Sequence, residues 1–169
     1  MNQEEKRLIQ NKYEIVSRIK QGGFGIVYKG YDHVFEKDVA IKAIEPSLLR
    51  EAKYIDLFLE EAKNAGKLSH NNIVHIYNLV RDESGQFFII MEYVNGVDLG
   101  KILKLCRTKN VILPHELSVF IVKEICKALE YAHNKRDLIT DIQDATKYSL
   151  IGFNPAIRRC VGLCNTSVV

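Results

Sequence analysis

Gln21-Gly22-Gly23-Phe24-Gly25-Ile26-Val27 is the stretch that decides the fold, because a glycine cluster here separates two runs rich in β-forming residues. The runs are Tyr13 to Ile19 and Gly25 to Tyr31, and together with the cluster they predict a hairpin with a long, flexible tip. Glycine lets backbone N–H groups approach phosphate oxygens and tolerates positive φ. A glycine cluster alone also fits a plain β-turn, so the downstream residues have to decide between the two.

A lysine and a glutamate follow this turn at an informative spacing. Lys42 lies in Val39-Ala40-Ile41-Lys42, on a third predicted strand, Val39 to Ile44, that ends before Pro46. Glu61 comes nineteen residues later, on a predicted helix. An ammonium on the strand would reach the α- and β-phosphates of a nucleotide, and a carboxylate on the helix would hold it by an ion pair. Either residue alone also fits an ordinary solvated side chain.

The remaining periodicity predicts an α+β fold. From Tyr54 a helical face collects Phe58, Glu61, Ala65 and Leu68, and this helix ends near Gly66. Two more strands, Ile73 to Val80 and Gln86 to Val94, are expected around the turn Asp82-Glu83-Ser84-Gly85. Together these elements predict a five-stranded antiparallel sheet with one helix packed on it. Two further helices are expected, over Asp98 to Arg107 and over Pro114 to His133, the second with a broad apolar stripe.

Three further motifs carry a resemblance to a known family. Val39-Ala40-Ile41-Lys42, Ser69-His70-Asn71-Asn72-Ile73-Val74 and Ile90-Met91-Glu92-Tyr93-Val94 occur in this order after the glycine turn. From about Tyr13 to His133 the chain resembles the ATP-binding lobe and first C-lobe helices of a protein kinase, closest to the eukaryotic-like Ser/Thr kinases of bacteria. The resemblance implies a transferase that binds ATP with Mg²⁺ and moves a phosphoryl group to protein hydroxyls.

The resemblance also assigns roles to single residues. It implies that Lys42 and Glu61 are the catalytic pair and that the glycine-rich loop covers the phosphates. It implies that apolar side chains line the adenine pocket, with Met91 as the gatekeeper at its back. It implies hydrogen bonds from adenine to the Glu92 carbonyl and the Val94 amide. It also implies that the Asp98 carboxylate contacts the ribose hydroxyls. The full set implied to bind the nucleotide is Ile19, Gly22, Gly23, Phe24, Gly25, Val27, Ala40, Lys42, Met91, Glu92, Val94 and Asp98.

Some of these positions have a simpler interpretation. Ile19, Val27, Ala40 and Met91 would lie in the sheet core of such a fold in any case. The family pattern also has three glycines in the loop, and Lys20 stands where the first is expected. Lys20 fits a solvated side chain or an additional phosphate contact.

The catalytic loop of the family is not found in this sequence. Phosphoryl transfer needs an aspartate to orient the acceptor hydroxyl, and an asparagine and a second aspartate to hold magnesium. The chain has neither H-R-D-x-x-x-x-N nor D-F-G. The nearest candidate, Lys135-Arg136-Asp137-Leu138, follows His133 too closely and has Ile142 where the asparagine is required. We therefore expect a truncated kinase, inactive alone and without protein ligands for Mg²⁺. A premature stop, a frameshift or a wrong gene boundary would produce such a chain.

Two other functions stay open at this stage. One is a non-catalytic module that binds nucleotide or docks to a protein partner through the exposed helix 114–133. The other is a decayed gene product without function. The expected organisation is an N-terminal extension over 1–12, an ATP-binding lobe over 13–94, a hinge with the first C-lobe helices over 95–136, and a divergent, poorly ordered tail over 137–169.

Composition indicates the class of protein, its partners and its cellular location. Charged residues make up 27% and hydrophobic residues 47% of the 169 residues, as in ordinary globular domains. The net charge of +3 arises after Asp144, from cations too few and scattered for a nucleic-acid footprint. The four cysteines, Cys106, Cys126, Cys160 and Cys164, form no C-x-x-C pair and are expected to be free thiols. With no apolar run long enough to cross a bilayer, we expect no membrane partner and a cytoplasmic location.

Overall fold

The computed structural model describes residues 7–22 and 25–135. They form two compact units. The first contains the chain up to Lys67 together with His75–Tyr93, and the second contains Leu68–Val74 and the chain from Val94 onward. The predicted tail 137–169, with Asp137, Cys160 and Cys164, lies outside the described residues.

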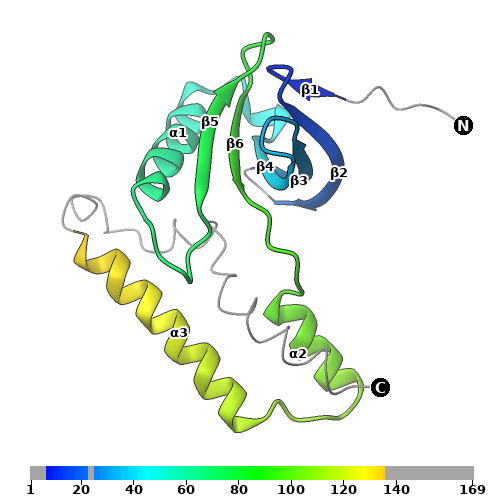
Figure 1. The fold of residues 1–169 in the computed structure, drawn as a ribbon, viewed down its shortest axis with the longest axis vertical. Helices are drawn as coiled ribbons and strands as arrows, with labels where there is room; N and C mark the ends of the chain where they lie inside the picture. Colours follow the sequence, from blue (N-terminus) through cyan, green and yellow to red (C-terminus); the bar gives the residue numbers. More distant parts are fainter. Residues whose placement is uncertain (1–6, 23–24, 136–169) are drawn as a thin grey trace, which may run out of the picture. The chain divides into compact units, whose positions relative to one another are not determined.

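The first unit is an antiparallel sheet with one long helix (Figure 1). Strand order is β1-β2-β3-β4-β6-β5, and every neighbouring pair is antiparallel. The strands are β1 Leu8–Ile9, β2 Tyr13–Gln21, β3 Gly25–Asp32, β4 Lys37–Ile44, β5 Ile76–Arg81 and β6 Phe87–Glu92. A 3₁₀ turn, η1 Pro46–Leu48, follows β4 and leads to α1 Ala52–Gly66, which lies beside β5. The predicted helix and all five predicted strands are confirmed within a few residues.

Both faces of this sheet carry a hydrophobic core. Successive residues of a strand point to opposite faces, and β4 is buried on both. Ile41 of β4 packs with Phe88 and Ile90 of β6 on one face. On the other face, Ile44 of β4 and Ile89 of β6 pack against Phe58 and Ala62 of α1. The helix therefore covers part of one defined face of the sheet, over β4 and β6.

The prediction of five strands is short by one. Leu8 and Ile9, assigned to an N-terminal extension, form β1 and pair with Glu14 and Tyr13 of β2. Ile9 is fully buried. Gln10 and Asn11 take positive φ angles of 52° and 51°, which make the tight reversal between the strands. A strand of two residues has no periodicity to detect, so β1 could not be recognised from the sequence.

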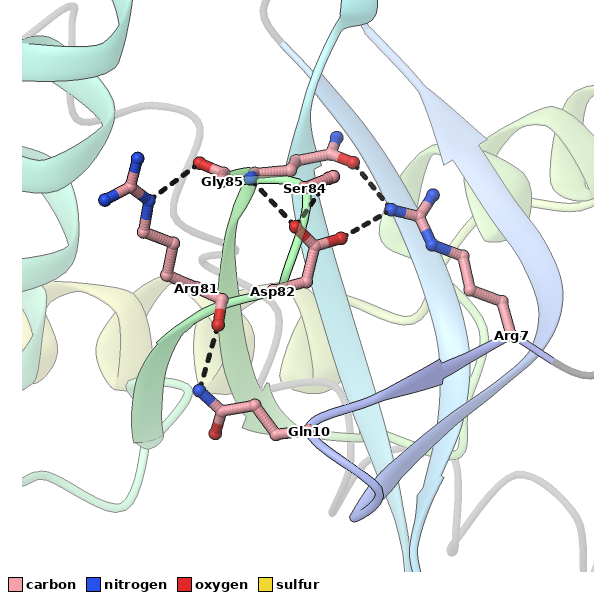
Figure 2. Close-up of polar contacts among 7 residues, drawn as sticks. Arg7, Gln10, Arg81, Asp82, Ser84 and Gly85 are labelled. Carbon is pink, nitrogen blue, oxygen red and sulfur yellow. Dashed lines mark hydrogen bonds and ion pairs between the residues drawn. The ribbon is translucent and has the colours of Figure 1, made fainter.

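The N-terminal segment is also tied to the turn between β5 and β6 (Figure 2). The Arg7 guanidinium donates to Asp82 Oδ2 and to Gln86 Oε1, both at 2.8 Å. Gln10 Nε2 donates to the carbonyl oxygen of Arg81 at 3.0 Å. These partners are more than seventy residues apart in the chain. The hydrogen bonds therefore join the segment before β2 to the β5–β6 turn.

The second unit consists of two helices and a short segment. The helices are α2 Leu99–Thr108 and α3 His115–Asn134, close to the predicted bounds. The segment Leu68–Val74 is fixed to α3, because Asn72 Nδ2 donates to Glu124 Oε2 at 2.7 Å and to its carbonyl oxygen at 3.0 Å. The Ser69 amide donates to Tyr131 Oη at 3.2 Å, and the His70 ring stacks on Tyr131. The apolar stripe of α3 is only partly covered: Ile121 and Ala128 are buried, whereas Phe120 is exposed.

Candidate functional site

An ion pair between the sheet and α1 is the centre of the candidate site. Lys42 Nζ lies 2.5 Å from Glu61 Oε1, as the sequence predicted. Lys42 is only 8% exposed because it stands in the middle of β4, opposite Val27 on β3 and Ile89 on β6. The Phe58 ring lies one helical turn before Glu61, with its centre 5.8 Å from Nζ. A buried ammonium needs such a partner, and the packing of α1 supplies it.

Apolar residues surround this lysine on the same face of the sheet. Residues directly opposite each other on neighbouring strands point to the same side. Val27 is opposite Lys42, and Ala40, two residues before Lys42, is opposite Met91. Val27, Ala40, Lys42 and Met91 therefore share the face on which α1 packs. The four residues assigned by sequence form one surface, with a cation at one end of it.

Ile19 differs from the other predicted pocket residues. It lies at an irregularity of β2, between Arg18 and Lys20, where the register with β3 shifts by one residue. Its side chain is 51% exposed. In this structure Ile19 is thus available to a ligand rather than part of the sheet core.

The glycine-rich turn is closed by a backbone hydrogen bond. The Gly22 amide donates to the Gly25 carbonyl oxygen at 2.9 Å, while Gly23 and Phe24 lie outside the described residues. A Cβ on Gly25 would come within 2.5 Å of the Ala43 carbonyl oxygen, whereas one on Gly22 would have ordinary room. Gly25 is therefore required by the packing of β3 on β4, and Gly22 leaves space beside the turn.

The base of the turn is held by contacts that sequence reasoning missed. Gln21 Nε2 donates to Glu45 Oε2 at 3.0 Å, and Arg18 Nη1 donates to Gln21 Oε1 at 2.9 Å. The first contact joins the end of β2 to the end of β4. It has no local sequence signal, because Glu45 is 24 residues away and is brought near only by the sheet.

Three predicted site residues lie where β6 ends and beyond it. Glu92 ends β6, and its amide donates to the His75 carbonyl oxygen at 2.8 Å. Val94 and Asp98 belong to the second unit. Asp98 is the N-cap of α2 and accepts a hydrogen bond from the Lys101 amide at 2.9 Å. That hydrogen bond lowers the pKa of the Asp98 carboxyl from its ordinary value, so this residue already has a structural role in starting the helix.

A metal centre of protein ligands is not formed by the part of the chain that the structure describes. Over residues 7–22 and 25–135, no three or more histidine, cysteine, aspartate or glutamate side chains gather as a cation site would require. Within the same residues, no helix combines the length and the apolar character needed to cross a membrane.

This geometry suits a ligand with a flat apolar part and an anionic part. The shared face of Val27, Ala40 and Met91 offers apolar contact, and the ammonium of Lys42 offers a fixed positive charge beside it. The Gly22–Gly25 turn lies at the end of the same hairpin. A nucleotide has both of these parts in one molecule.

The comparisons with known proteins agree with this description. Residues 13–145 match the model of the protein kinase domain. That match covers well over half of the chain, and the chain belongs to the protein kinase family.

The matched relatives are bacterial Ser/Thr kinases. The chain is 30% identical over 141 residues to the serine/threonine-protein kinase PksC of Streptomyces coelicolor, a match over 82% of this chain and 25% of the relative. It is 33% identical over 135 residues to PrkC of Bacillus subtilis, over 80% of this chain and 20% of the relative. The chain thus spans a quarter or less of the length of these curated relatives.

A solved structure gives the same result for the fold. The crystal structure of the M. tuberculosis PknI kinase domain superposes with a TM-score of 0.58 at 26% identity, covering 72% of this chain and 47% of that domain. The fold is therefore a kinase-like N-lobe sheet with its helix, followed by some of the C-lobe helices.

Proposed function

We propose that this chain binds ATP on the α1 face of its sheet, as a Ser/Thr protein kinase N-lobe does. The observation that carries the proposal is the buried Lys42–Glu61 ion pair beside an apolar face. Glu61 holds the Lys42 ammonium in position for the α- and β-phosphates, because a fixed cation needs no reorganisation when the anion arrives. Val27, Ala40, Met91 and the exposed Ile19 contact the adenine ring.

The remaining predicted residues complete this proposed site. The glycine-rich turn of Gly22, Gly23, Phe24 and Gly25 is assigned to the phosphates, as the family resemblance implies, because glycine keeps side chains out of the way. The family resemblance, without support from the structure, assigns the Glu92 carbonyl and the Val94 amide to hydrogen bonds with adenine. The same resemblance assigns the Asp98 carboxylate to the ribose hydroxyls.

We further propose that these 169 residues by themselves bind nucleotide without transferring its phosphoryl group. ATP supplies the γ-phosphoryl group in the family reaction, and Mg²⁺ neutralises its charge. The sequence provides Lys42 and Glu61 but no H-R-D-x-x-x-x-N and no D-F-G. Without these motifs no aspartate orients the acceptor hydroxyl, and no asparagine and aspartate hold the metal.

Thermal unfolding of the chain with and without millimolar Mg-ATP tests the proposal. A ligand that binds only the folded state at one hundred times its Kd adds about 2.7 kcal/mol to the unfolding free energy. We expect wild type to unfold at a higher temperature with Mg-ATP than with Mg²⁺ alone. Lys42→Ala should lose this shift.

The control is Lys53→Ala, which removes the same charge from an exposed position on α1. Each shift is measured within one variant, because Lys42→Ala also leaves Glu61 without its partner and lowers the starting stability. Equal shifts in wild type and Lys42→Ala would remove Lys42 from the site. No shift in wild type would contradict nucleotide binding and favour a docking module.

A further inference from the structure

Lys20 is the residue at which this chain departs from the family's glycine pattern, and the sheet places it in line with the candidate site. Lys20 is opposite Val27 on β3, and Val27 is opposite Lys42 on β4. Opposed residues point to the same face of a sheet. Lys20 and Lys42 therefore lie on the α1 face, separated by the single side chain of Val27.

A β-bulge produces this arrangement. Arg18 is opposite Tyr28 and Lys20 is opposite Val27, so Ile19 is an extra residue on β2. In an unbroken ladder Ile19 would oppose Val27 and Lys20 would oppose Ile26. A shift of one residue moves a side chain to the other face. The bulge thus turns Lys20 toward the face of Lys42, and without it the ammonium would point away from the site.

Hydrogen bonds hold the residues on either side of Lys20, whereas its own side chain is exposed. Gln21 is held by Arg18 and Glu45, and Gly22 is bonded to Gly25. Lys20 itself is exposed. Over the residues that the structure describes, its ammonium has no ion pair or hydrogen bond. Arg18, a second cation, lies opposite Tyr28 on the other face. The Glu45 carboxylate accepts from Gln21 and, among the described residues, forms no ion pair with Lys20.

The spacing suits an extended anion. Two strand separations of about 4.8 Å put the Lys20 and Lys42 backbones roughly 10 Å apart, and both ammonium groups sit on flexible four-carbon stems. A chain of phosphates between them would meet one cation held by Glu61 and a second that is exposed. Adenosine, which has no phosphate, would meet neither charge.

We propose that Lys20 is a second cation of the nucleotide site, which binds the phosphate chain and makes the site prefer ATP and ADP over adenosine. This inference rests on the proposed nucleotide site. Lys20 adds a cation at the position where the family pattern has a glycine. Its contribution is screened by salt because the side chain is exposed.

The test compares Kd values of ATP, ADP and adenosine, each with millimolar Mg²⁺, by isothermal titration calorimetry on the full chain. Lys20→Gln keeps most of the side-chain length and removes the charge, Lys20→Arg keeps the charge, and Lys53→Gln is the matched surface control. We expect Lys20→Gln to weaken ATP and ADP binding roughly three- to tenfold and to leave adenosine unchanged. Lys20→Arg and Lys53→Gln should bind like wild type.

The salt dependence supplies an independent readout. Raising the ionic strength should reduce ATP affinity less in Lys20→Gln than in wild type, since the variant has one exposed cation fewer. Unchanged ATP binding by Lys20→Gln, or an equal loss for adenosine and ATP, would overturn the inference while leaving the proposed nucleotide site intact. Absence of ATP binding by wild type would refute both.

Discussion

The two units of this chain bury their apolar residues in different ways. In the sheet unit, β4 and β6 are covered on both faces, and residues such as Val39, Ile41 and Phe88 are inaccessible to solvent. In the part of the helical unit that the structure describes, only Val74, Ile121 and Ala128 are buried apolar residues. Large apolar side chains of α3 remain exposed there, including Val119, Phe120 and Val122.

This difference matters for the candidate site. Lys42 stands on the strand with the most complete burial, and Glu61 stands on the helix that covers the same sheet. The geometry of the pair therefore depends on a core that lies within one unit. The helical unit instead relies on polar contacts, such as those of Asn72 and Tyr131, to fix its short segment on α3.

The largest expected effect comes from removing a core side chain of the sheet unit. Phe88 is fully buried in the core cluster that also contains Ile41 and Val80. Phe88→Ala should therefore lower the free energy of unfolding by about 3–5 kcal/mol. Phe120→Ala makes the same change at a side chain that is 38% exposed, and it should cost less than about 1.5 kcal/mol. Urea denaturation followed by circular dichroism measures both. Equal losses of unfolding free energy would mean that the Phe120 side chain contributes as much to stability as the buried Phe88 side chain.

The sequence was sufficient for most of this architecture, because the strands and α1 have clear periodicity. The pairing of Lys42 with Glu61 was also predictable, since two motifs place them on a strand and on an adjacent helix. The face shared by Val27, Ala40 and Met91 follows from alternation once the strand order is known.

Other features required the folded chain. The bulge at Ile19 is defined by the pairing of β2 with β3. The alternation of residues within β2 does not show which β3 residue each of them opposes. The two-residue β1 is set by its pairing with Tyr13 and Glu14. The resemblance explained Gly25 by the approach of phosphate, whereas the structure shows that the Ala43 carbonyl already excludes a side chain there.

A smaller effect is expected inside the helical unit, at Asn72. Asn72→Ala removes two hydrogen bonds to Glu124 at a side chain with 9% exposure, which should cost about 1–3 kcal/mol. Hydrogen exchange of α3 amides measures the loss locally, and protection near Glu124 should fall. Asn71→Ala is the matched control, because this neighbouring asparagine is exposed. If both variants left exchange unchanged, the segment Leu68–Val74 would not be held by this contact.

The smallest effect concerns the contact between the N-terminal segment and the β5–β6 turn. Partial burial raises the pKa of Asp82, but hydrogen bonds from Ser84, Arg7 and the Gln86 amide outweigh it and leave the pKa below its ordinary value of 3.8. A carboxyl whose pKa is lowered by folding stabilises the folded state at pH values above its unfolded pKa. That contribution is lost as the pH falls through the folded pKa.

Asp82→Asn should therefore be less stable than wild type by about 1 kcal/mol near neutral pH, and the difference should shrink as the pH falls below 3.8. Thermal unfolding across this pH range measures it, with Glu83→Gln as the control on the neighbouring exposed carboxylate. A pH-independent difference would mean that the shape of Asp82, rather than its charge, holds Arg7. Arg7→Ala should reduce the Asp82→Asn difference by the part that the ion pair contributes, while the hydrogen bonds from Ser84 and the Gln86 amide keep the remainder. That coupling would place the segment before β2 within the cooperative sheet unit that carries Lys42, although the pattern of the sequence assigns it to an extension.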